Sequence, residues 1–145
     1  NTDELGFILD RTTGFETPSV SRIITGEDIT DLRALAKDVL MSSPVREYIA
    51  KLVISTHPES AEANSTCKKY IRYGSSPRGA QALALAAKVN ALMEGRFNVG
   101  FEDVKQMIIP ALRHRLLLNF EAQAEGIPVE SIIDELIKEA PVGDK

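Results

Sequence analysis

The segment that most constrains how this chain folds is an alanine-rich run at residues 77–94, which carries its own start and stop signals. Ser76 is a favoured N-cap residue, and Pro77 suits the first helical position because its missing N–H would be unpaired there. Gly95 supplies a C-terminal stop. Alanine has the highest helix propensity and takes little space. The run therefore predicts one long helix that packs tightly against its neighbours.

The larger apolar residues of this run predict which side of the helix is buried. Leu85, Val89 and Leu92 recur at helical spacing, so we expect them to face the core. Ala82 and Ala86 would allow a neighbouring helix to approach closely.

Helical patterns also occur on both sides of the alanine-rich run. A capping-box-like start at residues 25–28 precedes an apolar stripe, and Ser43-Pro44 opens another helix that ends at His57-Pro58. The stripe after residue 28 consists of Ile29, Leu32, Ala36, Val39 and Leu40. Residues 59–69 are polar and indicate a loop.

The second half of the chain continues this pattern. Gly100 and Asp103 predict a helix start, and Pro110 is expected to end that helix. An apolar stretch allows a short strand near 116–120, and a last helix is predicted over 129–140. The predicted fold class is mostly α, a small helical bundle.

Composition excludes several classes of function. The formal net charge of −4 argues against a general nucleic-acid binder, whose affinity would depend on a basic surface. No apolar run approaches the ~20 residues of a membrane span. Cys67 is the only cysteine, so neither an internal disulfide nor a cysteine-based zinc site is expected. We expect an unreactive thiol, no metal site and a cytoplasmic protein.

Arg78 is the strongest candidate for a functional residue. It lies in the first turn after Ser76 and Pro77, where unpaired N–H groups and the helix dipole favour an anion. Its planar, permanently charged guanidinium suits phosphate oxygens. On these residues alone, a plain surface arginine after a good helix cap explains the pattern as well.

Four short motifs occur in order around this arginine. They are the Ser76–Gly79 turn, the alanine-rich helix ending in Gly95-Arg96, the run Glu102-Asp103-Val104, and the segment from Pro110 through Leu112 to His114-Arg115. Together they resemble the C-terminal lid of AAA+ ATPases of the MoxR family, over most of the chain from about Asp3 onward. Gly79 and Gly100 depart from the family pattern, which more often has Ala and Thr or Ser there.

The resemblance implies a division of labour between two parts of a larger ATPase. Residues 1–25 would be a helix and linker from the ATPase core, and residues 26–145 the helical lid. The chain contains no G-x-x-x-x-G-K-[ST] phosphate loop, so the domain alone is expected to be inactive and to hold no cofactor. The parent protein would hydrolyse ATP with Mg²⁺.

The family assigns Arg78 the role of the "sensor 2" arginine, a catalytic residue that contacts ATP together with Ser76, Pro77 and Gly79. The partners implied are the ATPase core of the same chain, neighbouring subunits of a hexameric ring, and a client protein. Such enzymes are chaperone-like.

The basic segment Arg113, His114 and Arg115 offers candidates for an interface with a neighbouring subunit or the core. A buried or capping histidine at a chain break explains His114 better. Arg96 is explained by the helix dipole alone.

Two other readings remain open. The lid of a magnesium-chelatase-type AAA+ subunit would have the same chemistry with a different client. A free-standing helical DNA-binding or regulatory module is allowed by short helices joined by turns, although the acidic balance opposes it.

Overall fold

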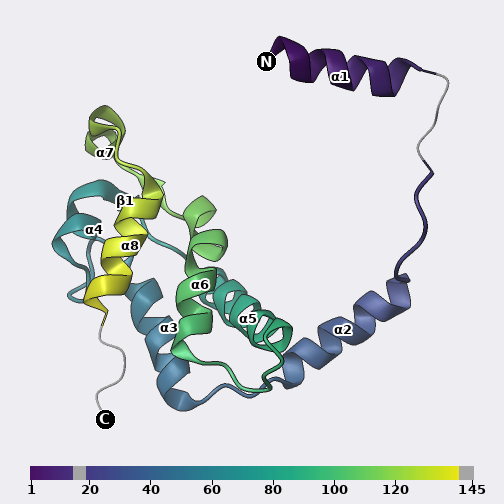
Figure 1. Cartoon of the computed structure of the whole chain (residues 1–145). Coiled ribbons are helices and arrows are strands. Elements are labelled where there is room, and N and C mark those ends of the chain that lie inside the picture. Colours follow the sequence, from purple (N-terminus) through teal and green to yellow (C-terminus); the bar gives the residue numbers. More distant parts are fainter. Residues whose placement is uncertain (15–18, 141–145) are drawn as a thin grey trace. The chain divides into compact units, whose positions relative to one another are not determined.

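The computed structural model describes residues 1–14 and 19–140, which are mostly helical (Figure 1). In chain order the elements are α1 (Thr2–Thr13), α2 (Gly26–Asp38), α3 (Ser43–Ser55), α4 (Ser65–Tyr70), β1 (Ile71–Tyr73), α5 (Pro77–Met93), α6 (Phe101–Leu112), the 3₁₀ helix η1 (Arg113–Arg115), β2 (Leu117–Leu118), α7 (Phe120–Glu125) and α8 (Val129–Glu139). The predicted mostly-α class is confirmed. Among the described residues, no helix combines the length and apolar character that crossing a membrane requires.

The chain divides into two compact units, residues 1–31 and 32–145, with the division inside α2. In the first unit, Asn1 and Glu4 form a capping box that begins α1. No residue of α1 is buried, and its large apolar side chains Phe7 and Ile8 are more than half exposed. The assignment of residues 1–25 to an ATPase core stays a prediction.

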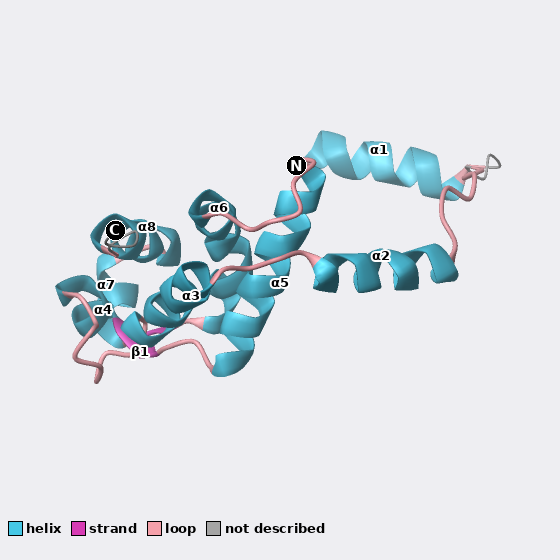
Figure 2. Ribbon diagram, turned by 90° about the horizontal axis from the view of Figure 1, so that it is seen from below, coloured by secondary structure: helices cyan, strands magenta, loops and turns pink. Residues whose placement is uncertain are grey.

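The core of the second unit lies among α3, α5, α6 and α8, which pack against one another (Figure 2). The long α5 begins and ends almost where the alanine-rich run predicts, and its main neighbour is α6. The fully buried side chains at the centre come from all four helices: Leu52, Leu83, Ile108, Leu112, Ile132 and Ile133. The helical bundle follows from burying one apolar side of each helix.

The predicted buried face of α5 is mostly wrong, although Leu92 is half-buried and packs against the core. Leu85 and Val89 are 46% and 40% exposed, whereas Leu83, Ala87 and Ala91 are completely buried. Apolar residues surround this helix on all sides, so helical spacing alone does not select a face. The small side chains on the observed face allow α6 to approach closely, and that contact decides which side is buried.

The apolar stripe predicted for α2 is also only partly buried. Ala36 and Val39 are in the core, but Leu32 and Leu40 are 55% and 71% exposed. The predicted capping box at its start is confirmed: Thr25 Oγ1 accepts from the Asp28 N–H at 3.0 Å, and the Asp28 carboxylate accepts from the Thr25 N–H at 2.6 Å.

A two-stranded antiparallel sheet joins β1 to β2, with Ile71 opposite Leu118 and Tyr73 opposite Leu117. The strand expected near 116–120 is therefore confirmed. The loop predicted over residues 59–69 is wrong at its end, because α4 begins at Ser65. Six residues are too few to show helical periodicity. The sequence signal for the start of α4 is its N-cap Asn64, whose side chain accepts from the Cys67 N–H at 2.8 Å.

Candidate functional site

The turn before α5 places Ser76 at the N-cap and Pro77 in the first turn of the helix, as predicted. The Ser76 side chain makes no capping hydrogen bond, so that expectation is wrong. Instead the Gly79 N–H donates to the Ser76 carbonyl at 2.8 Å. The Ser76 side chain lies on the surface.

Arg78 lies in the first turn of α5 and is exposed. Within residues 1–14 and 19–140 it makes no hydrogen bond or ion pair. An arginine held by its own domain would have carboxylate or carbonyl partners. Its guanidinium is therefore available to a group supplied from outside the domain.

The backbone of the turn is held by the end of α3. The Ser75 N–H donates to Thr56 Oγ1 at 2.9 Å, and the Ser75 carbonyl lies 2.9 Å from His57 Nε2. His57 lies just beyond the C-cap of α3, and its side chain is 36% exposed. The sequence gives no signal for this contact, because its partners are 18 residues apart.

Gly74 and Gly79 are both required by close packing. A Cβ on Gly74 would lie 2.7 Å from the Thr56 carbonyl oxygen. A Cβ on Gly79 would lie 1.9 Å from Ser75 Oγ and 3.0 Å from Leu112 Cδ2. Ser75 is completely buried, and its hydroxyl finds no hydrogen-bond partner in the described part of the chain. A glycine at position 79 thus leaves the space that the buried Ser75 side chain occupies.

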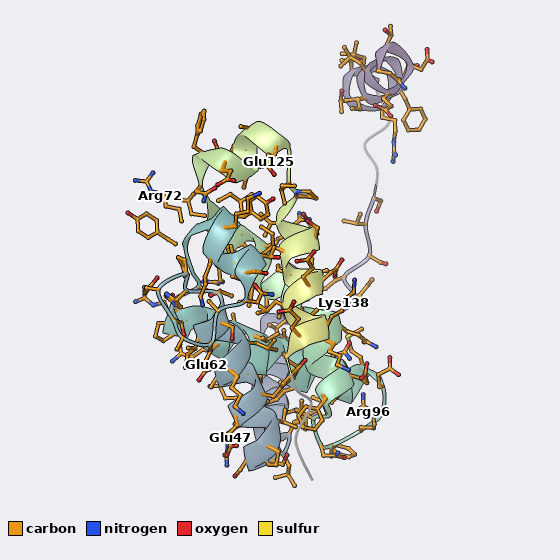
Figure 3. All side chains as sticks on the ribbon, turned by 90° about the vertical axis from the view of Figure 1, so that its left-hand side faces the viewer. Glu47, Glu62, Arg72, Arg96, Glu125 and Lys138 are labelled. Atoms are coloured by element: carbon orange, nitrogen blue, oxygen red, sulfur yellow. The ribbon has the colours of Figure 1, made fainter. Side chains whose placement is uncertain are left out.

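Arg96 lies in the loop that joins α5 to α6 (Figure 3). Its side chain is bound within the domain. Its guanidinium donates to both carboxylate oxygens of Asp103, at 2.6 and 2.8 Å. Asn90 Nδ2 and the Gly100 N–H each donate to the same carboxylate at 2.8 Å. The hydrogen bond from Arg96 is the main reason why the pKa of Asp103 falls to about 2, and Gly100 and Asn90 add to it.

This network shows that the helix dipole is an incomplete explanation for Arg96. The predicted cap at Gly100 and Asp103 is confirmed, but the capping carboxylate is also 1% exposed and shared with Arg96. The pair fixes the α5–α6 connection and is structural.

The three basic residues of η1 are all exposed. Arg113 lies 3.3 Å from the Glu130 carboxylate, and Arg115 Nε donates to the Ala111 carbonyl at 3.1 Å. His114 has no hydrogen-bond partner among the described residues. The expectation of a buried or capping His114 is wrong. The 3₁₀ helix η1 directly follows α6 and leaves the His114 ring exposed on the surface.

Cys67 is fully buried, and burial is the main reason why the pKa of its thiol rises to about 11. A thiol that stays protonated at neutral pH is a poor nucleophile, which agrees with the expected unreactive cysteine. In the described ranges, no group of three or more His, Cys, Asp or Glu side chains has the geometry of a metal site.

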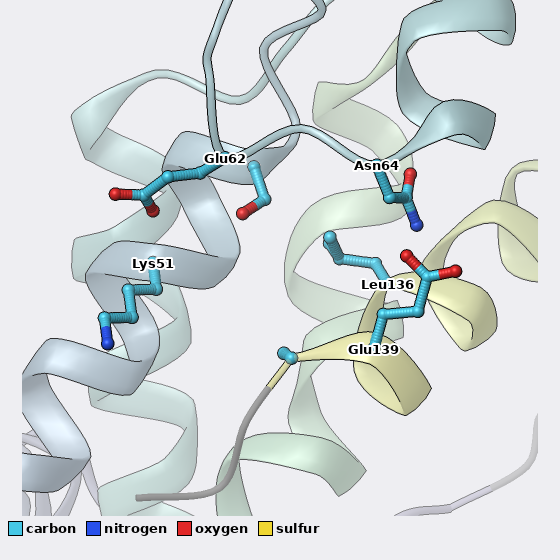
Figure 4. A pocket seen from close by; sticks show the side chains of 7 residues that line it. Lys51, Glu62, Asn64, Leu136 and Glu139 are labelled. Atoms are coloured by element: carbon cyan, nitrogen blue, oxygen red, sulfur yellow. The ribbon is translucent and has the colours of Figure 1, made fainter. Parts of the chain in front are cut away.

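A cavity of about 410 Å³ lies on another part of the domain, between α3, the segment before α4, and α8 (Figure 4). Lys51, Glu62, Asn64 and Glu139 are among its lining residues, and none of the lining residues belongs to α5. Two carboxylates and one ammonium leave this cavity without an excess of positive charge, so it does not suit a phosphate.

Comparison with known proteins identifies the fold. The AAA lid domain family matches residues 63–136, just over half of the chain. The chain is 28% identical to the chaperone MoxR1 of Mycobacterium tuberculosis over 125 residues, covering 86% of this chain and 33% of that protein. It is 38% identical to the protein MoxR of Paracoccus denitrificans over 107 residues, covering 70% of this chain and 31% of that protein.

A crystal structure of a "putative ATPase" from Cytophaga hutchinsonii superimposes with a TM-score of 0.81 at 28% identity, covering 99% of this chain and 44% of that chain. The chain spans about a third of the length of the curated relatives that it matches. The family match, these relatives and the solved structure agree with the motifs around Arg78, and the chain therefore belongs to the AAA lid domain family, as the lid of a MoxR-type AAA+ ATPase.

Proposed function

We propose that this domain is a nucleotide-sensing lid in which Arg78 contacts the γ-phosphate of ATP bound by the ATPase core. The observation that carries the proposal is the state of Arg78: an exposed guanidinium on the first turn of a long helix, without a partner in the described residues. By contrast, Arg96 and Arg113 are paired with carboxylates of their own domain.

The binding free energy that the lid alone can offer ATP is smaller than even millimolar affinity requires. An exposed ion pair contributes ~0–1 kcal/mol, and a helix terminus adds ~0.3–1 kcal/mol. Even a millimolar ligand needs ~4 kcal/mol. The isolated domain therefore neither retains nor hydrolyses ATP, and Arg78 acts only where a core domain supplies the rest of the nucleotide site.

Closing the lid over the core strengthens this contact. Excluding water lowers the local dielectric, so that the guanidinium stabilises the charge on the transferring phosphoryl group more strongly. Pro77 fixes the first turn of α5, Gly79 lets it pack closely, and the Ser76 hydroxyl offers a further donor to the nucleotide. Mg²⁺ held by the core would accompany ATP and would neutralise part of the phosphate charge.

Hydrolysis removes the γ-phosphate contact and releases the lid as a rigid body. We infer that this movement reaches neighbouring subunits of a hexameric ring and, through them, a client protein in a chaperone-like, cytoplasmic cycle. Arg113, His114 and Arg115 are exposed on η1 and are candidates for the contact with a neighbour or the core.

Steady-state ATP hydrolysis by the intact ATPase tests this proposal. Arg78→Ala is expected to lower kcat roughly 10²-fold without changing the thermal unfolding of the lid. Arg78→Lys keeps the charge but not the planar fork, so it should recover only part of the activity. Arg33→Ala, which removes an exposed arginine of α2, is the matched control and should leave turnover unchanged. Normal turnover by Arg78→Ala would remove Arg78 from the site.

A further inference from the structure

Residues at the end of α3 hold Ser75, the residue that precedes the Ser76–Gly79 turn. Thr56 is completely buried; its Oγ1 donates to the Val53 carbonyl at 2.6 Å and accepts from the Ser75 N–H at 2.9 Å. His57 Nε2 lies 2.9 Å from the Ser75 carbonyl oxygen. Two consecutive residues of α3's end therefore satisfy both backbone polar groups of Ser75.

Gly74 packs closely against the Thr56 backbone, which leaves Ser75 no space to shift relative to Thr56 and His57. A side chain at Gly74 would collide with the Thr56 backbone, since a Cβ would lie 2.8 Å from its carbonyl carbon. On the other side, the Ser75 side chain is enclosed against Gly79. The peptide between Ser75 and Ser76 is thus held from α3 and from α5 at once.

The chemistry of this contact fixes where His57 carries a proton. A carbonyl oxygen only accepts hydrogen bonds, so Nε2 of His57 must be the protonated donor. Nδ1 of the same ring faces the Glu59 carboxylate at 3.4 Å, and Glu59 is 75% exposed. An exposed contact of that length contributes little, so the bond from Nε2 is the one that orients Ser75.

We propose that His57 is a positioning residue for Arg78. By holding the Ser75 carbonyl it sets the direction in which the chain enters α5, and with it the direction of the guanidinium three residues later. Small displacements of a charge-stabilising group lower catalysis much more than they lower binding. This inference rests on the proposed role of Arg78 and adds a residue that contacts no nucleotide.

Two substitutions at His57 separate the hydrogen bond from the ring. Gln places an amide donor where Nε2 lies, whereas Asn reaches only as far as Nδ1. In the intact ATPase, His57→Asn should lower kcat about fivefold, the usual size of one lost hydrogen bond, with KM for ATP changed less than twofold. His57→Gln should restore kcat. Glu59→Gln is the matched control and should behave like the wild type.

The Arg78→Ala background distinguishes positioning from a general structural role. If His57 acts through Arg78, His57→Asn causes no further loss of kcat once Arg78 is absent. An equal fivefold loss in that background would overturn the inference, and so would unchanged kcat in His57→Asn alone. If Arg78→Ala itself has no effect, the proposed function fails first, independently of His57.

A measurement on the unmodified chain covers the case in which His57→Asn does not fold. Imidazole ¹⁵N chemical shifts at neutral pH should show a proton on Nε2 of His57. A ring protonated only on Nδ1 would contradict the hydrogen bond to Ser75 and the inference with it.

Discussion

At the scale of single residues, Asp103 shows what a sequence motif can and cannot predict. Its place three residues after Gly100 predicts the cap at the start of α6, because capping is local. The sequence does not predict its bonds to Arg96 and Asn90, which form only when the α5–α6 connection folds back. The same limit applies to the proposed site: Arg78 can be proposed from its own turn, whereas the contact of His57 with Ser75 appears only in the fold.

The Asp103 network makes the free energy of unfolding of the domain depend on pH. The pKa of this carboxyl is about 2 in the folded domain and ~3.9 in an unfolded chain. Because the unfolded chain takes up the proton first, the stabilisation of ~2 kcal/mol is complete above about pH 5 and is lost as the pH falls from about 4 to 2. Urea unfolding at pH 7 should show Asp103→Asn to be ~2 kcal/mol less stable, with the two curves converging near pH 2. A gap that stays constant with pH would contradict the assignment.

Ser75 and Gly79 should be coupled in stability. In most helices Gly→Ala is stabilising by ~1 kcal/mol, but here the new Cβ meets Ser75 Oγ. We therefore expect Gly79→Ala to be neutral or destabilising in the wild type and stabilising in a Ser75→Ala background. A double-mutant cycle of thermal unfolding measures this coupling, expected at ~1 kcal/mol or more. Additive effects would show that the serine moves aside at no cost.

At the scale of elements, the bounds of α5 could be predicted far better than its orientation. Ser76, Pro77 and Gly95 mark the ends of the helix chemically. The choice of face depends on which neighbour approaches, and an alanine-rich helix accepts a neighbour on any side. Helix α4 was missed for a related reason: its six residues gain their stability from packing against α7 and α8 rather than from their own pattern.

Two leucines of α5 test the observed face directly. Leu83 is completely buried and Leu85 is 46% exposed, although they lie only two positions apart. Leu83→Ala should cost 2–5 kcal/mol by leaving a cavity, whereas Leu85→Ala should cost about 1 kcal/mol or less. Chemical unfolding of both variants gives the comparison. Equal costs, or a larger cost at Leu85, would mean that the helix is rotated from the position described here.

At the scale of the whole molecule, the chain corresponds to only a part of its relatives. The relatives are about three times as long as the matched region, and the chain contains no phosphate loop. In the proposed function, the lid contributes a helical body that holds Arg78 at its surface. The family could be predicted from the order of four motifs, whereas the hexameric ring rests on the resemblance alone and no residue of this chain names the client.

The most direct test of the central claim compares the affinities of the intact ATPase for ATP and ADP, measured by calorimetry with a slowly hydrolysed ATP analogue. If Arg78 contacts the γ-phosphate, Arg78→Ala should weaken binding of the ATP analogue roughly tenfold, the size of one charge-assisted hydrogen bond. Binding of ADP, which lacks that phosphate, should be unchanged. Equal weakening for both nucleotides, or none for either, would contradict the account.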